Sequence, residues 1–349
     1  MGLPLHRLPG GHRPRASVTS AIVGDLVTID AIRAAAERLR GITIRTPLVG
    51  FGGPADRHFL KAESLQPIGA FKLRGAYVAM ESLAPEALAR GVITYSSGNH
   101  AQGVARAARL LGAPAVVVMP SDAPSIKRDR VAADGAEIVI VGTASDERQR
   151  VAEQIAAERG LAIIPPFDHD RIIAGQGTVG LEIVEDLPDV TAVLVPIGGG
   201  GLASGVATAV KALRPSTRVI GVEPELAADA QASFRRREIV RWPADQVSRT
   251  IADGTRTQAL GERTFAHLLA HLDDIVTVSE SEISAGVRLA AERSRLVVEP
   301  SGALAVAALA FHAAETGVSD VPGPVVAVVS GGNVEPEAYR RYLEAPLPD

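Results

Sequence analysis

The chain contains no cysteine. It therefore lacks disulfides, thiolate metal ligands and cysteine nucleophiles, and this composition fits a reducing compartment such as the cytoplasm. Aromatic residues make up only 3% of the 349 residues and the net charge is −4, so neither base stacking nor attraction to phosphates favours nucleic-acid binding. No apolar run approaches the ~20 residues that a membrane-spanning helix needs, so we expect no membrane contact.

From residue 30 onward, short apolar runs alternate with amphipathic stretches, and this alternation predicts an α/β fold. The expected strands are nearly continuous apolar runs, as strands covered on both faces are, and the long connections favour parallel sheets. The sequence therefore predicts two doubly wound, mainly parallel sheet domains. The expected strands are 92–95, 115–119, 137–141, 161–164, 192–196, 218–222 and 325–329; the expected helices are 31–39, capped at Ile29-Asp30, and 98–111, 125–134, 146–159, 202–213, 284–294 and 301–315.

The domain limits follow from this alternation. We expect a large domain built from residues 26–69 and 164–349 and a small α/β domain from residues 70–163. Residues 1–25 are expected to be a flexible tail, because their basic residues are followed by no apolar core of signal-peptide length. No Gly/Ser-rich tether separates the halves, which predicts a ligand in the cleft between them.

Lys72 is the first candidate for chemistry. It lies between Phe71 and Leu73, with Gly69 and Gly75 on either side. Apolar neighbours remove water from an amine and lower its pKa, which makes the neutral form available to bond to a carbonyl carbon. The alternative is a surface lysine at the start of a helix.

A polar turn, Ser96-Ser97-Gly98-Asn99-His100, follows an expected strand and begins an expected helix. The backbone N–H groups at such a position are free and can hold an anion, for example a substrate carboxylate. The same residues could also serve only as helix caps.

Four successive glycines, Gly198, Gly199, Gly200 and Gly201, follow another expected strand and precede a helix. Glycines let successive N–H groups converge on a phosphate, and the helix dipole adds a favourable field. A dinucleotide-binding loop is the rival interpretation: Gly198, Gly200 and Ala203 fit only its relaxed form, and Glu223 would be its acidic residue.

Ser330 ends the expected strand 325–329 and begins a Ser-Gly-Gly-Asn segment. Its hydroxyl can form a hydrogen bond with an unprotonated pyridine nitrogen, where a carboxylate would keep that nitrogen protonated. This choice favours the prompt expulsion of a β-substituent over a long-lived carbanion. A reactive amine, a polar turn, a glycine nest and this strand end are together the parts needed to hold pyridoxal phosphate.

Two carboxylates form a weaker candidate for a metal site. Glu223 lies just beyond a strand and Asp229 lies six residues later. With the carbonyl oxygen of Ala227 and waters they could hold a hard divalent cation, although two solvated acids are the simpler interpretation. The neighbouring Arg235-Arg236-Arg237 is most simply a solvated turn. The histidines show no metal-binding pattern such as His-Glu-x-x-His.

With these motifs the chain resembles the threonine/serine dehydratase and serine racemase family, pyridoxal-phosphate enzymes of the tryptophan-synthase-β-like fold. The resemblance runs from about Ala31 to Tyr342. It rests on Gly-Ala-Phe-Lys-Leu-Arg-Gly-Ala, Ser-Ser-Gly-Asn-His-Ala-Gln-Gly, Gly-Gly-Gly-Gly-Leu and Ser-Gly-Gly-Asn, in that order, and is supported by Ala-Gly-Gln-Gly-Thr at 174–178 and Val-Glu-Pro-Ser-Gly-Ala at 298–303.

The resemblance implies a role for each motif and a cytoplasmic homodimer acting on a small amino-acid substrate. Lys72 would be the Schiff-base lysine, and Ser97 would face the reacting carbon. A Mg²⁺ or Ca²⁺ ion would be bound by Glu223, Ala227 and Asp229. The other implied contacts are Asn99 to the cofactor ring oxygen, Gly198, Gly199, Gly200, Gly201 and Leu202 to its phosphate, Ser330 to its pyridine nitrogen, and Ser96, Ser97, Asn99 and His100 to the substrate carboxylate.

The implied reaction is β-elimination from a hydroxy amino acid, L-threonine or L-serine, which gives a 2-oxo acid and ammonia. Serine racemisation is the alternative within the family, since both activities share Ser97. Another 3-hydroxy amino acid, such as 3-hydroxyaspartate or phenylserine, is a third possibility. A nicotinamide-dependent dehydrogenase explains neither Lys72 nor Ser330, and a non-catalytic amino-acid sensor does not explain an intact reactive lysine.

Overall fold

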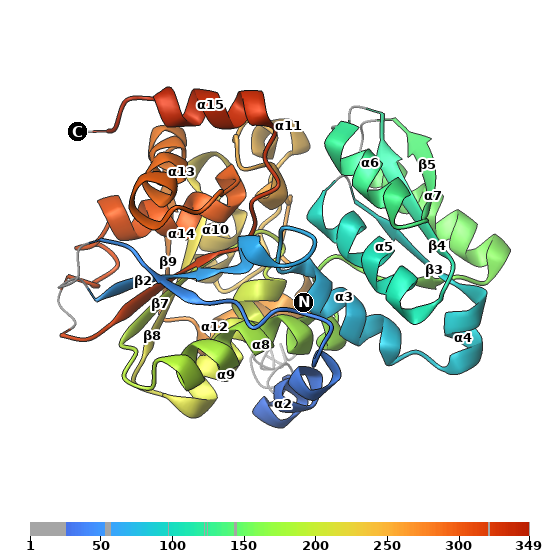
Figure 1. Ribbon diagram of the computed structural model, residues 1–349, viewed down its shortest axis with the longest axis horizontal. Helices are drawn as coiled ribbons and strands as arrows, with labels where there is room; N and C mark the ends of the chain where they lie inside the picture. The colour runs from blue at the N-terminus through green and yellow to red at the C-terminus, as the bar shows by residue number, and fades with distance from the viewer. Residues whose placement is uncertain are drawn as a thin grey trace, which may run out of the picture.

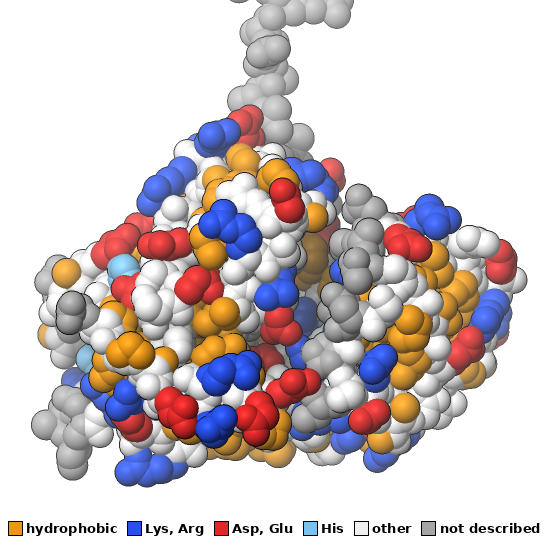
Figure 2. Space-filling view, turned by 90° about the horizontal axis from the view of Figure 1, so that it is seen from above, with side chains coloured by type: hydrophobic (Ala, Val, Ile, Leu, Met, Phe, Trp, Pro, Cys, Tyr) orange, Lys and Arg blue, Asp and Glu red, His pale blue; other side chains and the backbone are white. Residues whose placement is uncertain are grey.

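The structure is a computed structural model that describes residues 26–52, 57–96, 98–121, 123, 125–142, 145–319 and 322–348. The predicted tail, residues 1–25, lies outside these ranges, as does Ser97. No helix in the described ranges combines the length and the apolar character that a membrane crossing needs. Acidic and basic side chains are interspersed over the face seen in Figure 2, in keeping with the small net charge of −4.

The larger of two sheets has the strand order β1-β2-β10-β7-β8-β9 (Figure 1). Every pair in it is parallel except β1 with β2, which run antiparallel. The predicted mainly parallel sheet is thus confirmed. Its strands are β1 (Leu48–Gly50), β2 (His58–Ala62), β7 (Ala192–Pro196), β8 (Arg218–Pro224), β9 (Asp274–Val278) and β10 (Val325–Val329).

Strand β10 shows why these strands are apolar throughout. Val326 and Val328 pack with Val206 and Val210 on one face of the sheet, whereas Val325 and its alternate neighbours pack with a helix on the other. A strand buried on both faces has no solvent side, so it shows no alternation of polar residues.

Helices cover both faces of the larger sheet. The helices α13 and α14 lie on one face, and α9 packs on the other with α8, α2 and α12. The helices around this sheet are α2 (Ile29–Arg38), α8 (Asp170–Asp186), α9 (Gly201–Leu213), α10 (Asp229–Arg236), α11 (Ala244–Val247), α12 (Glu262–His271), α13 (Glu280–Ser294), α14 (Pro300–Phe311) and α15 (Pro336–Glu344), with the 3₁₀ turns η2 (Glu63–Leu65), η3 (Glu225–Ala227) and η4 (Asp253–Thr255).

The smaller sheet has the order β5-β4-β3-β6 and is parallel throughout. It lies beside the larger unit with its own helices (Figure 1). The predicted domain limits, 26–69 with 164–349 and 70–163, stay a prediction. The elements of this unit are β3 (Val92–Tyr95), β4 (Ala115–Pro120), β5 (Glu137–Val141), β6 (Ala162–Ile163), α3 (Lys72–Glu81), α4 (Pro85–Arg90), α5 (Asn99–Leu111), α6 (Ser125–Ala133) and α7 (Ser145–Arg159).

Most predicted elements differ from the structure only at their ends, and two details were wrong. Thr28 caps α2, since its side chain accepts a hydrogen bond from the N–H of Ala31, while Asp30 lies inside the first turn. The predicted helix 301–315 ends at Phe311. The sequence analysis also predicted none of the following elements of the larger unit: β1, β2, β9, α8, α10, α11, α12 and α15.

Candidate active site

Lys72 is the first residue of α3 and is partly buried. Its Nζ donates to the carbonyl oxygen of Pro166 at 2.7 Å and lies 5.2 Å from the centroid of the Phe71 ring. Burial lowers the pKa of Lys72 to about 8. The other lysines of the chain, Lys61, Lys127 and Lys211, each form an ion pair with a carboxylate. Lys72 is thus the lysine suited to react as a neutral amine.

The segment before Lys72 pairs with the end of β10. The backbone N–H of Phe71 donates to the carbonyl of Ser330 at 3.1 Å, and that of Gly332 donates to Gly69 at 2.9 Å. This pairing brings the backbone of Ser330 next to Phe71, the residue before the lysine. Among the described residues, the buried hydroxyl of Ser330 donates only a long 3.4 Å bond, to the carbonyl of Ser301, so it can turn to a ligand.

Asn99, the first residue of α5, joins the same group. Its Nδ2 donates to Oε1 of Glu299 at 2.5 Å, and its Oδ1 accepts from Nδ2 of Asn333 at 2.8 Å. Glu299 is a site residue that the sequence reasoning did not select, although it lies in the Val-Glu-Pro-Ser segment. The buried Oε2 of Glu299 has no hydrogen-bond partner among the described residues.

Glu299 also has a shifted pKa. Burial raises it to about 7, and the negative charge of Asp253 adds to the shift, while the positive charge of Lys127 opposes it. A buried carboxyl without full hydrogen bonding favours its neutral form. Near neutral pH this acid can therefore either hold or release a proton beside Asn99.

The glycine loop, residues 198–201, lies between β7 and α9. The ring of Phe167 packs against it. A Cβ on Gly199 would lie 2.2 Å from the Phe167 ring, so only glycine fits under that ring. Gly200 has φ +91°, a conformation that favours glycine. Leu202 follows in the first turn of α9, where backbone N–H groups are free to bind a phosphate. Phe167 follows Pro166, whose carbonyl accepts from Lys72, so these two residues connect the loop to the lysine.

The polar turn before α5 is only partly described. Ser97 lies outside the described residues, and the hydroxyl of Ser96 accepts from the N–H of Gly98 at 3.2 Å. His100 is buried, and its Nε2 lies 3.0 Å from the carbonyl of Ile164. Burial and the charge of Lys72 lower the pKa of His100 to about 3. The imidazole is therefore neutral, and an anion here would bind to backbone N–H groups of the helix start.

Side chains of both units meet next to this site. Lys127 of α6 forms an ion pair with Asp253 of η4, and Arg130 of α6 donates to Asn333. A hollow of 360 Å³ beside them is lined by residues of both units, including Gly69 and Gln102. This position agrees with a ligand site between the two units.

The candidate metal ligands lie elsewhere, at the end of β8. Glu223 accepts backbone N–H bonds from Ala230 at 3.1 Å and Gln231 at 2.7 Å, whereas both carboxylate oxygens of the fully buried Asp229 lack a partner in the described structure. Burial raises the pKa of Asp229 to about 7, and burial together with the charge of Asp229 raises that of Glu223. Ala227 is buried in η3 between them.

These residues do not form a metal site by side chains alone. Among the described residues, no three His, Cys, Asp or Glu side chains cluster as metal ligands do. A cation at this place would use two carboxylates, the Ala227 carbonyl and waters, a set of oxygen donors that suits Mg²⁺ or Ca²⁺. The two unpartnered oxygens of Asp229 fit such an ion, because a buried carboxylate is costly without a partner.

Comparison with known proteins agrees with this geometry. The sequence profile of the pyridoxal-phosphate dependent enzyme family matches residues 39–331. The chain is 42% identical to L-threo-3-hydroxyaspartate ammonia-lyase of Saccharomyces cerevisiae, over 88% of this chain and 94% of that protein. It is 43% identical to L-threonine ammonia-lyase of Geobacter sulfurreducens, over 90% of this chain and 78% of that protein.

A solved structure extends the likeness to three dimensions. The structure of maize serine racemase matches with a TM-score of 0.86 and 36% identity, over 92% of this chain and 98% of that one. The predicted family and fold are confirmed, and the dinucleotide interpretation of the glycine loop loses its support. The chain belongs to the pyridoxal-phosphate-dependent enzymes of fold type II, in the family of threonine/serine dehydratases and serine racemases.

Proposed function

We propose that the protein eliminates the β-hydroxyl of a hydroxy amino acid, L-threonine or L-serine, and releases a 2-oxo acid and ammonia. The observation that carries this proposal is the state of Lys72. It has no carboxylate partner among the described residues and its pKa is lowered to about 8. Its chain neighbour Phe71 is bonded to Ser330, and Pro166, which accepts from its Nζ, precedes the ring that covers Gly199. A neutral amine in this setting suits covalent attachment of a carbonyl cofactor.

The residues present fit pyridoxal phosphate. Gly198, Gly199, Gly200, Gly201 and Leu202 would hold its phosphate at the start of α9, where a side chain on Gly199 would meet Phe167. The hydroxyl of Ser330, which makes only one long bond among the described residues, would donate to the unprotonated pyridine nitrogen. Asn99 would contact the ring oxygen. When bound, the cofactor supplies an electron sink that acidifies the Cα–H of an attached amino acid.

The chain's own residues then perform three tasks. Lys72, once free of the cofactor, is the general base that takes the Cα proton, and burial keeps enough of it neutral near pH ~7 to do so. The start of α5, with Ser96, Ser97, Asn99 and His100, binds the substrate carboxylate through N–H groups and hydroxyls. Ser97 would face the reacting carbon.

The preferred substrate is a separate part of the proposal. Similarity to L-threonine ammonia-lyase supports threonine, and similarity to L-threo-3-hydroxyaspartate ammonia-lyase supports 3-hydroxyaspartate as a further candidate, beside phenylserine. Serine racemisation is the second candidate function, and the match to maize serine racemase with a TM-score of 0.86 is the observation that favours it.

The decisive experiment combines trapping and turnover. Borohydride reduction of the holoenzyme, followed by peptide mass mapping, should place the cofactor on Lys72. The enzyme is then incubated with L-threonine, L-serine and L-threo-3-hydroxyaspartate, while 2-oxo acid and D-serine are quantified. Lys72→Ala should abolish both cofactor trapping and 2-oxo acid formation, whereas Lys211→Ala should retain both. Full turnover by Lys72→Ala would refute the assignment, and D-serine without 2-oxo acid would replace the lyase by the racemase.

Four further points belong to the same proposal. A Mg²⁺ or Ca²⁺ ion bound by Glu223, Ala227 and Asp229 is supported by the unpartnered oxygens of Asp229. The homodimer and the cytoplasmic location stay predictions, as do the domain limits. Size-exclusion chromatography with light scattering measures the oligomeric state directly.

A further inference from the structure

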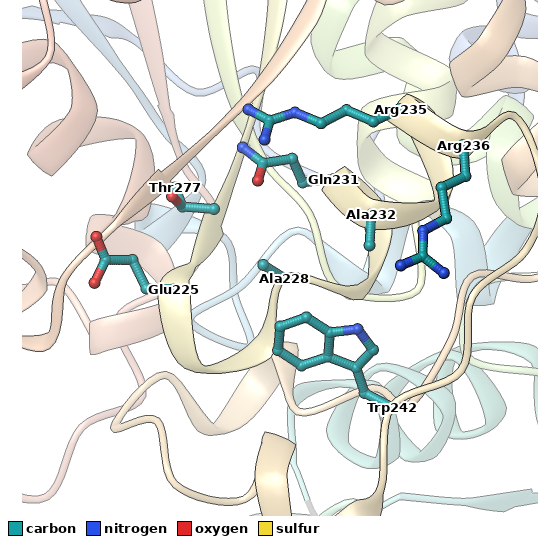
Figure 3. A pocket seen from close by; sticks show the side chains of 8 residues that line it. All are labelled: Glu225, Ala228, Gln231, Ala232, Arg235, Arg236, Trp242 and Thr277. Atoms are coloured by element: carbon teal, nitrogen blue, oxygen red, sulfur yellow. The ribbon is translucent and has the colours of Figure 1, made fainter.

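Two hollows of the described structure differ in how their polar side chains are held. In the hollow of 470 Å³ beside α10 and η3, Arg235 and Arg236 are exposed and form no ion pair within the described part of the chain (Figure 3). In the hollow of 360 Å³ between the two units, Arg130 and Asn333 are bonded to each other. The second hollow therefore has a fixed polar wall, and that wall leads to the proposed active site.

Asn333 is one of only two asparagines in the chain, and the other, Asn99, is its hydrogen-bond partner. The side-chain amide of Asn333 is held at both ends. The guanidinium of Arg130 can only donate, so it takes Oδ1, whereas the carbonyl of Ile68 can only accept, so it takes Nδ2 at 2.9 Å. These two partners leave the Asn333 amide a single orientation.

This orientation passes to Asn99. The second hydrogen on Nδ2 of Asn333 is donated to Oδ1 of Asn99 at 2.8 Å, so the oxygen of Asn99 faces Asn333 and its Nδ2 faces away. That Nδ2 donates one hydrogen to Oε1 of Glu299 at 2.5 Å. Its other hydrogen has no acceptor among the described residues, and it is available to a ligand.

Gly331 shows where the Asn99 amide lies. A Cβ on Gly331 would overlap Oε1 of Glu299 and lie 3.1 Å from Nδ2 of Asn99, so glycine leaves the space that the amide occupies. Gly331 directly follows Ser330, which is proposed to contact the pyridine nitrogen of the cofactor. The oriented Nδ2 of Asn99 is therefore at the same strand end as the proposed ring contact.

We propose that Arg130 and Asn333 are positioning residues, which hold the Asn99 amide so that its nitrogen and not its oxygen meets the ring oxygen of pyridoxal phosphate. This inference rests on the proposed function. An N–H donor at the ring oxygen stabilises its anionic form, whereas an amide oxygen there would favour the protonated form. Because Arg130 belongs to the smaller unit and Asn333 follows a strand of the larger one, the orientation requires both units.

The first test observes the two asparagines directly and needs no cofactor. Full-length protein labelled with ¹⁵N in the asparagine side chains should give two NH₂ signals by NMR, and the one lost in Asn333→Leu identifies Asn333. Burial and the charge of Asp253 raise the pKa of Glu299 to about 7, while Lys127 opposes this shift. We expect the Asn99 signal to move as the pH passes ~7, because its Nδ2 lies on that carboxyl, and Glu299→Gln should abolish the movement.

The second test measures the absorbance of the bound cofactor, which depends on whether its ring oxygen carries a proton. Asn333→Leu should raise the pH midpoint of the absorbance change by about 1 pH unit, a tenfold weaker acid. Arg130→Met should raise it by less, since Ile68 still holds one end of the Asn333 amide. Arg130→Lys, whose ammonium can only donate, should restore the parental midpoint.

Arg128→Met is the matched control. Arg128 lies on the same helix and carries the same charge as Arg130, but it forms none of these bonds in the described structure. We expect its absorbance midpoint to equal that of the parent. Equal midpoints in Arg128→Met and Arg130→Met, both above the parental value, would reveal a simple charge effect and overturn the role of Arg130.

Two further results would contradict the proposal. An Asn99 signal that stays constant through pH ~7 would mean that its nitrogen does not face Glu299, and a parental absorbance midpoint in Asn333→Leu would remove the role of Asn333. Failure of the parent to take up pyridoxal phosphate would refute the proposed function, and the NMR signals would still decide the orientation. Circular dichroism confirms folding, and Arg130→Met, at an exposed residue, replaces Asn333→Leu if that variant is unfolded.

Discussion

The side-chain amide of Asn99 donates to Oε1 of Glu299 at 2.5 Å, although 200 residues separate the two in the sequence. Asn99 begins a helix of the smaller unit, and Glu299 precedes a helix of the larger one. The second oxygen of Glu299 is buried and has no partner in the described structure. The bond therefore joins the two units at an acid whose charge is not fully compensated.

Glu299→Gln should change how stability depends on pH. Burial raises the pKa of Glu299 from 4.5 to about 7. The folded protein therefore binds this proton more tightly than the unfolded chain. Protonation of Glu299 thus stabilises the folded state in full below pH ~4.5, and this stabilisation is lost as the pH rises through ~7. Glutamine mimics the neutral acid. Well above pH ~7 the variant should exceed the parent in free energy of unfolding by about 3 kcal/mol, and below pH ~4.5 the two should agree.

Urea unfolding of both proteins across this pH range measures the difference. The exposed Glu292, changed to glutamine, is the control and should give a difference that is small at every pH. A constant difference between Glu299→Gln and the parent would show that Glu299 does not titrate in this window.

Arg74 should be far more important to stability than an exposed arginine nearby. Its buried guanidinium donates to Glu63 at 2.8 Å, to Glu182 at 2.6 Å and to Thr178 at 3.0 Å. Arg74→Met would leave two buried carboxylates with too few partners, which costs about 3–5 kcal/mol. The partly exposed Arg38, paired with Glu81, is the matched control, because such pairs contribute about 0–1 kcal/mol.

Denaturant unfolding of Arg74→Met and Arg38→Ala checks this comparison. Similar losses in the two variants would contradict the role given to burial. A second readout is cofactor binding: because Arg74 and Lys72 share the first turns of α3, Arg74→Met should also weaken retention of the cofactor, whereas Arg38→Ala should not.

The sequence predicted most of the strands, because a strand that is buried on both faces must consist of apolar residues. A strand such as Val325–Val329 can only be apolar when both faces are covered. The order of Lys72, the glycine loop and Ser330 in the sequence was enough to predict the cofactor, because each lies at the end of a strand or the start of a helix, where such a fold binds ligands.

Other parts of the site could not be predicted, since they depend on contacts between distant segments. Charged residues in a sequence indicate a surface, yet Lys61, Glu63 and Arg74 are buried together. Only the folded chain places Glu299 against Asn99.

Gly199→Ala should disturb the glycine loop through steric overlap alone. The φ of Gly199 is one that alanine can adopt, but the added Cβ would lie 2.2 Å from the ring of Phe167. Overpacking of this kind costs about 1–3 kcal/mol. We expect a lower free energy of unfolding and weaker cofactor retention, measured by denaturant unfolding and by the absorbance of the bound cofactor.

A second change tests the cause. Phe167→Ala removes the overlapping ring, so the pair Gly199→Ala/Phe167→Ala should be less destabilised than the sum of the two single variants. Gly50→Ala, at a glycine whose Cβ would meet nothing within 4 Å, is the control and should be close to neutral. Strict additivity of the two single variants would mean that the ring is not what restricts residue 199.

A divalent cation should stabilise the protein through Asp229. Both oxygens of this buried carboxylate lack a partner among the described residues, and a cation that binds the folded chain alone adds about 2.7 kcal/mol when its concentration is ~100 times Kd. Mg²⁺ or Ca²⁺ should therefore raise the Tm of the EDTA-treated enzyme. Asp229→Asn should abolish that rise, because an amide carries no charge to offset dehydration of the ion, while the exposed Asp245→Asn should retain it. Equal rises in Asp229→Asn and the parent would place the cation somewhere else.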